Sequence, residues 1–204
     1  LSQFFINNRK EWGDPRIDKW ASKVGGTFEG VPSGYPAGQV PERKSFYLAA
    51  LKNEPLLGNI MNYGELQFIL AEAALKGYIS GDVETFYNKG VEAAVTLWNV
   101  PLPADYLTRD GVRWEPAVSF DAQMEQIHVQ KYYTLFFTDF QQWHEYRRTG
   151  HPVLPKGEGL SNNGNMPARF KYPVYVQSLN KANYDAAVAA MGGDDINTKV
   201  WWNK

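Results

Sequence analysis

Hydrophobic residues recur at helical spacing in the later part of the chain but not at its beginning. Over residues 61–77, apolar side chains cover most of the expected helix surface, and a narrow polar face carries Glu65 and Glu72. This pattern predicts a buried helix with the two glutamates on its solvated edge. A second apolar stripe over residues 83–98 predicts another helix, for which Asp82 is a suitable N-cap.

The two predicted helices and their short connection form a unit over residues 61–99. Its design is that of a tetratricopeptide repeat, in which small residues let two antiparallel helices approach closely. Such a unit cannot bury its faces alone and needs stacked neighbours. We therefore expect it to pack against the helix predicted over residues 120–148 and against helices outside this chain. The small residues at the expected contact are Ala71, Ala74, Gly90 and Ala94.

The longest helical pattern begins at Ser119 or Asp121 and ends at Gly150, which suits a left-handed C-cap. The pattern permits a break near residues 134–138. A last short helix is predicted over about residues 181–190. The positions of the long helix that we expect to face inward are Phe120, Met124, Ile127, Tyr132, Leu135, Phe136, Phe140 and Trp143.

Residues 1–60 are irregular, because prolines and glycines interrupt any sustained period. A brief helix over residues 4–10 and a short strand over residues 24–29 fit the local pattern. Loops of this length in a compact domain are commonly functional, so we expect the ligand-binding loops here. With the helix pair and the segment 119–204, the sequence predicts one mainly α domain over residues 1–204, a helical-repeat scaffold with long irregular loops.

Composition excludes several classes of function. The formal net charge is −1 and the basic residues are spread along the chain, so the basic stripe of a nucleic-acid-binding protein is missing. There is no cysteine, which excludes thiolate metal sites and cysteine nucleophiles. Aromatic residues make up 15% of the chain, and they supply either core volume or flat faces for sugar rings.

No catalytic motif stands out. His144 and Glu145 would open a zinc-protease motif only if a second histidine stood at position 148, where the chain has Arg148. No Gly-x-Ser-x-Gly elbow occurs, and no spacing among the 22 acidic residues singles out a pair for glycoside hydrolysis. We predict no catalytic residue, no cofactor and no catalytic metal. The sequence leaves open whether Asp194 and Asp195 bind a structural ion.

Five short segments resemble a known protein family. In chain order they are residues 63–73 (YGELQFILAEA), 143–150 (WHEYRRTG), 167–173 (PARFKYP), 180–184 (NKANY) and 198–202 (TKVWW). Each segment alone means little, but their order and spacing resemble the C-terminal portion of the SusD/RagB family. These are surface lipoproteins of Bacteroidetes-type bacteria that bind nutrients, mostly glycans.

The resemblance implies non-catalytic binding of an oligosaccharide at the bacterial outer surface and its delivery to a TonB-dependent, SusC-like transporter of the outer membrane. It also implies that the chain is part of a larger lipoprotein whose lipid-anchor segment lies outside this sequence. In the family pattern, Arg147, Arg148 and Arg169 are scaffold residues, and Trp201 and Trp202 pack the tail onto the helices.

Ligand contacts are expected from aromatic residues in loops, because a sugar offers a C–H face to a ring and hydroxyls to neighbouring polar groups. The segment Asp14-Pro15-Arg16 resembles a tripeptide that precedes the binding loops in the family. The alternative function is a helical-repeat adaptor whose loops grip a protein or peptide, and a glycoside hydrolase ranks lower. The candidate ligand-binding residues are Trp12, Trp20, Phe28, Tyr35, Tyr47 and Trp114, with Tyr106 beside Trp114 in the second loop.

Overall fold

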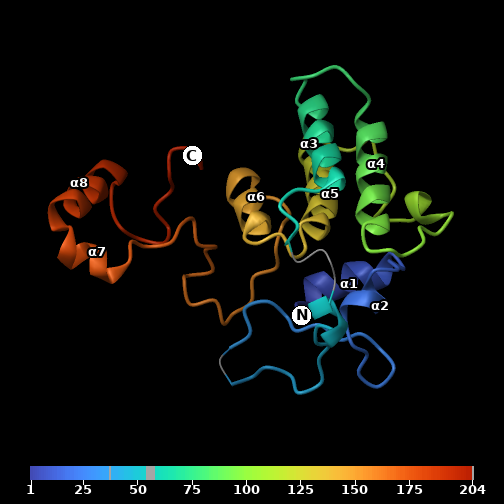
Figure 1. The fold of residues 1–204 in the computed structure, drawn as a ribbon, viewed down its shortest axis with the longest axis horizontal. Helices are drawn as coiled ribbons and strands as arrows, with labels where there is room; N and C mark the ends of the chain where they lie inside the picture. The colour runs from blue at the N-terminus through green and yellow to red at the C-terminus, as the bar shows by residue number, and fades with distance from the viewer. Residues whose placement is uncertain (37, 54–57, 204) are drawn as a thin grey trace.

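The computed structural model describes residues 1–36, 38–53 and 58–203 and is mainly α-helical, as predicted. The helices are α1 (Gln3–Glu11), α2 (Ile17–Trp20), η1 (Ala49–Asn53), α3 (Tyr63–Leu75), α4 (Val83–Thr96), η3 (Tyr106–Thr108), α5 (Phe120–Thr134), α6 (Gln141–Thr149), α7 (Val174–Leu179) and α8 (Lys181–Met191). Figure 1 shows α3, α4 and α5 side by side, with α1 and α2 next to them and α7 and α8 as a separate pair. Within the described ranges, no helix is long and apolar enough to cross a membrane.

Helices α3 and α4 form the predicted antiparallel pair, and α5 packs against both (Figure 1). Asn62 caps α3 and Asp82 caps α4, each accepting a hydrogen bond from the backbone amide three residues later. At the contact between the two helices, a Cβ atom at Gly90 would lie 2.8 Å from the ring of Phe68. The absence of a side chain at Gly90 therefore lets the fully buried Phe68 ring lie against the α4 backbone.

The predicted long helix is divided into α5 and α6 by a short turn, close to the position that the sequence permitted. In this turn, Phe137 and Asp139 have left-handed backbone conformations, with φ angles of 65° and 42°. Such conformations are unfavourable for residues other than glycine and persist only where the surrounding structure enforces them. Gly150 ends α6 with a φ angle of 80°, as predicted.

Two residues expected to face inward along this helix do not. Phe120 is 53% exposed at the start of α5, and Phe140 is 52% exposed at the N-cap of α6. The interior residues Met124, Ile127 and Leu135 are buried as expected. The turn between α5 and α6 explains why the helical period fails at Phe140.

In its described residues, the N-terminal region contains the predicted short helix, observed as α1, but no strand. The expected strand over residues 24–29 is only an isolated bridge between Val24 and Thr27. Gly25 and Gly26 lie between these two residues with positive φ angles, so the chain reverses at once and cannot extend.

A buried polar cluster centred on Asp14 holds this region against the helices. The Asp14 carboxylate accepts hydrogen bonds from Arg16 at 2.6 Å, from the Tyr106 hydroxyl at 2.6 Å and from Arg9. The Arg9 guanidinium lies 3.6 Å from the ring centre of Tyr133 on α5. All five side chains are fully or almost fully buried. One carboxylate thus connects α1, the residues before α2 and the loop that follows α4. Through Arg9, it is also linked to Tyr133 of α5.

The cluster holds two cations for one anion. Burial alone would raise the pKa of Asp14, but the charges and hydrogen bonds of Arg16 and Arg9 lower it well below its usual range. Burial lowers the pKa of Arg9 to about 10, so its guanidinium stays charged near neutral pH. The faces of Tyr133 and Trp20, 3.6 Å and 4.7 Å from that guanidinium, stabilise the second positive charge.

The C-terminal segment adds α8, which was predicted, and α7, which was not. Asp194 fixes this segment by accepting hydrogen bonds from Arg169 at 2.8 Å and from the Tyr184 hydroxyl at 3.2 Å. The expected packing of Trp201 is wrong, because this side chain is 83% exposed. Trp202 is more covered and lies with its ring 4.7 Å from the guanidinium of Arg147.

We predict that Asp14→Asn lowers the free energy of unfolding by about 3–5 kcal/mol, because it leaves two buried guanidinium groups without their carboxylate. Urea denaturation followed by circular dichroism measures this change. The control is Asp18→Asn, which removes an exposed pair with Lys23 that contributes at most about 1 kcal/mol. Equal effects of the two substitutions would contradict a central role for Asp14.

The same cluster predicts a loss of stability in acid. The pKa of Asp14 is lower in the folded state than in the unfolded state, so its stabilisation is present at neutral pH and declines as the pH falls below about 5. The decline should be shallower in Asp14→Asn. Unfolding free energies measured from about pH 7 to pH 3 test this slope.

Candidate functional site

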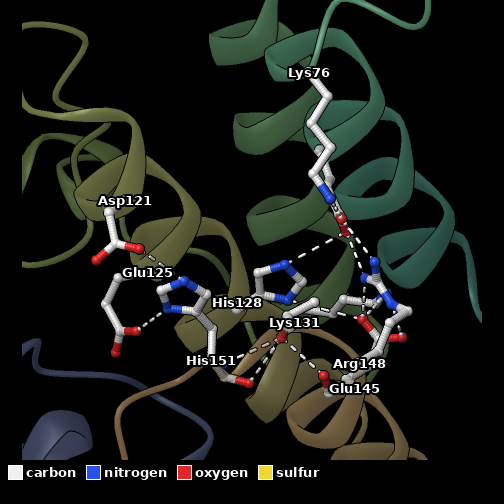
Figure 2. A network of polar contacts seen from close by, with 10 residues as sticks. Lys76, Asp121, Glu125, His128, Lys131, Glu145, Arg148 and His151 are labelled. Carbon is white, nitrogen blue, oxygen red and sulfur yellow. Dashed lines mark hydrogen bonds and ion pairs between the residues drawn. The ribbon is translucent and has the colours of Figure 1, made fainter. Parts of the chain in front are cut away.

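A network of charged side chains joins α3, α5 and α6 (Figure 2). Arg148 donates to both oxygens of Glu72, at 2.7 Å and 2.6 Å, and Lys76 donates to the same carboxylate at 2.5 Å. Lys131 and Arg148 each donate to Glu145 at 2.8 Å. The prediction that Glu72 lies on a solvated edge is wrong, because the side chains of Arg148 from α6 and of Lys76 reach its carboxylate and leave only 6% of the residue exposed. Glu65, which was assigned to the same edge, is also buried.

His128 lies inside this network, and the group it forms with Glu72 and Glu145 resembles a metal site. One ligand atom from each lies within 4.8 Å of the other two. However, three cations already neutralise the two carboxylates, namely Lys76, Lys131 and Arg148. A divalent ion would have to displace at least one of them, so this arrangement does not fit a metal centre.

The network is also unsuited to acid–base catalysis. Burial acts to raise the pKa values of Glu72 and Glu145, but hydrogen bonds from Arg148 and the neighbouring cations lower both. A general acid for glycoside hydrolysis must hold a proton near neutral pH, which these carboxylates do not. Burial raises the pKa of Glu65, which lines a cavity of about 500 Å³ beside the network. The other carboxylates that line it, Glu72 and Glu145, are held by Arg148.

Most of the loop aromatics proposed as ligand contacts lie in the hydrophobic core. They belong to the hydrophobic core cluster, and at most 9% of the surface of each residue is exposed. Rings buried to this extent offer no free face to a sugar. The aromatic residues in this position are Trp12, Trp20, Phe28, Trp114 and Tyr106.

Tyr47 and Tyr35 are more accessible. Tyr47 is 56% exposed and lies with its ring 5.8 Å from Phe136 and 6.2 Å from Phe137. Tyr35 is half-buried in a loop that packs against the backbone of Gly159. Of these two residues, Tyr47 lines a small cavity beside the α5–α6 turn, and Tyr35 does not.

An open aromatic cavity lies beside the turn between α5 and α6, and we call it the aromatic hollow. It has a volume of about 230 Å³. Tyr132 and Gln142 also line a smaller cavity that reaches Tyr47. The aromatic hollow is lined by Tyr132, Asp139, Phe140, Gln142, Trp143, Tyr146, Leu154 and Met166.

The lining of the aromatic hollow has the chemistry that a sugar ring requires. The rings of Phe140 and Trp143 meet near edge-on at 6.3 Å. Beside this lining, Phe170 is 66% exposed and its ring centre lies 4.7 Å from that of Trp143. Asp139 and Gln142 add one carboxylate and one amide to this apolar surface. Aromatic faces with a few convergent polar groups are typical of small-ligand sites.

Sequence reasoning missed this site because Tyr132, Phe140 and Trp143 follow a helical period and were assigned to the core. The available signal was the permitted break near residues 134–138. A break at that point rotates the following helix and releases its first aromatic residues from the core. The left-handed conformation of Asp139 within the turn is a further sign of a functional position.

A family model described as "Starch-binding associating with outer membrane" matches residues 1–173. The match covers most of the chain, so the chain belongs to this SusD-like family. The resemblance noted in the sequence is thereby confirmed. Among curated proteins, no sequence matches the chain.

Solved structures agree with this assignment. A SusD homologue from Bacteroides fragilis has 25% identity and a TM-score of 0.82, and the alignment covers 100% of this chain and 52% of that one. A SusD-like protein from Bacteroides thetaiotaomicron has 26% identity and a TM-score of 0.81, covering 97% and 49%. A chitin-binding protein has 28% identity and a TM-score of 0.77, covering 100% and 49%. The chain spans about half the length of these structures.

We predict that Glu72→Gln lowers the free energy of unfolding by about 2–4 kcal/mol, because it removes the charge that Arg148 and Lys76 share at a buried site. The matched control is Glu92→Gln, at an exposed position of α4. Urea denaturation of both variants measures the difference. If Glu72→Gln behaved like the control, the network would not hold α6 against α3.

Proposed function

We propose that this protein binds an oligosaccharide without catalysing its cleavage, and that the aromatic hollow is the binding site. The observation that carries this proposal is the cluster of the exposed Phe140 and Phe170 with the partly buried Trp143, beside Asp139 and Gln142. Membership of a family described as starch-binding, and likeness to a chitin-binding protein, support a glycan as the ligand. Binding through stacking and a few hydrogen bonds should give micromolar to millimolar affinity.

The absence of catalysis is part of the proposal. Hydrolysis of a glycosidic bond uses two carboxyl groups on either side of the bond. Asp139 is the one carboxylate among the described residues that line the aromatic hollow. The nearby Glu145 belongs to the charged network and is bound by Lys131 and Arg148.

We also propose that the whole protein is a surface lipoprotein of the outer membrane that passes its ligand to a TonB-dependent, SusC-like transporter. The family's description as associating with the outer membrane supports the location. The transporter follows from the family resemblance alone. Co-purification of the protein with such a transporter from bacterial membranes tests both statements.

A helical-repeat adaptor is the second candidate. The observation in its favour is the apolar side of α3, where Tyr63, Leu66 and Ile69 are 58%, 39% and 38% exposed. Such a face suits contact with further helices. This function predicts stable binding of a protein and no binding of any glycan.

The first test is an array of polysaccharides and oligosaccharides, with calorimetry of each ligand that binds and chromatography to detect cleavage. We expect saturable binding and no released product. Release of product would instead support a glycoside hydrolase. If no glycan on the array bound and the protein instead formed a stable complex with another protein, the adaptor would be favoured.

We predict that Phe140→Ala weakens glycan binding about 3- to 10-fold, because it removes one stacking face. Tyr47→Ala should have a smaller effect, since Tyr47 lies in the adjoining cavity. The matched control is Phe120→Ala, which removes an equally exposed ring at the distant start of α5. Unchanged affinity in Phe140→Ala, with the fold intact, would exclude the aromatic hollow as the site.

A further inference from the structure

A further cavity lies at the C-terminal end of α6 and is also lined by residues of the following segment and of the end of the chain. It has a volume of about 430 Å³, and no aspartate or glutamate is among the described residues that line it. We call it the cationic pocket. Its cationic and amide-bearing residues are Arg147, Arg148, Lys156, Lys199, Asn165 and Asn203.

The four cations of the cationic pocket are not equivalent. Arg148 is already neutralised by Glu72 and Glu145 in the charged network. Arg147, Lys156 and Lys199 form no ion pair with any described residue, and both lysines are exposed. The pocket therefore carries three positive charges without a counter-ion, although the chain as a whole has a net charge of −1.

Arg147 is held in place by its surroundings. Its guanidinium lies 3.8 Å from the ring centre of Trp143 and 4.7 Å from that of Trp202, and it donates to the carbonyl oxygen of Ala168 at 3.1 Å. Its Nε atom is buried and has no hydrogen-bond partner. A guanidinium fixed between two rings loses little further entropy on binding a planar or tetrahedral oxyanion.

One feature opposes an anion. The C-terminal end of α6 faces the cationic pocket, and the carbonyl groups there carry a partial negative charge of about half an electron. The three uncompensated cations exceed this partial charge several-fold. The amides of Asn165 and Asn203 add hydrogen-bond donors that do not depend on charge.

The cationic pocket adjoins the aromatic hollow. Tyr146 and Met166 line both cavities, and Arg147 of one stacks on Trp143 of the other. We propose that the protein prefers acidic oligosaccharides, whose carboxylate, sulfate or phosphate group occupies the cationic pocket while a neighbouring ring occupies the aromatic hollow. This inference rests on the proposed function and specifies its ligand class.

An anionic membrane surface is the other possible partner for such charges. Basic segments that bind membranes present their side chains on a convex, exposed face. Here Arg147 lines a concave pocket, lies against the rings of Trp143 and Trp202, and is next to a surface suited to sugar rings. The geometry therefore favours a sugar-borne anion.

The experiment compares acidic oligosaccharides with their own neutral derivatives by calorimetry. Oligogalacturonate is paired with its methyl ester, and a sulfated oligosaccharide is paired with its desulfated form. We expect one acid to bind at least about tenfold more tightly than its neutral partner at low salt. That preference should shrink as ionic strength rises from about 0.05 M to 0.5 M, whereas binding of the neutral partner should not change.

Charge-reversal variants test the cationic pocket itself. The double variant Lys156→Glu and Lys199→Glu should lose the preference for the acid and retain affinity for the neutral partner. Both positions are exposed, so the thermal unfolding curve should be unchanged. The control is Lys89→Glu, an exposed position on α4 far from both cavities, which should keep the preference.

Each of the following results would overturn the inference. Equal binding of acid and neutral partner would refute it and leave the proposed function standing. A preference that survives the double variant would place the anion elsewhere. Binding of vesicles rich in phosphatidylserine, without preference for any acidic sugar, would assign the charges to a membrane. No glycan binding at all would refute the proposed function as well.

Discussion

The structure depends on one buried carboxylate. Over residues 1–36 and 38–53, regular structure is limited to α1, α2 and η1, and side-chain contacts are needed to fix these elements against the other helices. Asp14 supplies the missing constraint, because it joins Arg9, Arg16 and Tyr106 in the interior and Arg9 stacks on Tyr133 of α5. Polar groups buried in this way have few alternative partners, so the cluster specifies where the loops meet the helices.

The longer helices α3, α4, α5 and α8 could be predicted from the sequence, whereas α7 and the contacts of the loops could not. The apolar stripes and caps located α3 and α4, since local periodicity and N-cap chemistry decide where such helices begin and end. Glu72 was misjudged because its partner Arg148 lies 76 residues away, and no local pattern reports a contact at that distance. Trp20 was assigned to a ligand site because the sequence predicted it to lie in a loop, but it ends α2 and is fully buried in the core.

The candidate site was predicted least well, and the reason is physical. A helical period identifies which residues share a face only while the helix continues. The turn between α5 and α6 ends that relation, so Phe140 and Trp143 leave the face on which Tyr132 lies and form a cavity with it.

The two neighbouring arginines of α6 differ in how their charges are balanced. Arg148 is neutralised on the side facing α3, whereas Arg147 faces the cationic pocket without a counter-ion.

The left-handed residues of the α5–α6 turn have a consequence for protein engineering. Glycine adopts such conformations at little cost, so replacing Asp139 by glycine should make the folded chain more robust to heat, whereas Phe137 packs against Trp98 and Phe136 and its replacement would lose these contacts. The chain instead carries side chains at both positions, and Asp139 forms part of the hollow's wall. A directed-evolution campaign that rewards heat tolerance alone would therefore tend to erase this wall, and selection should include a ligand from the first round.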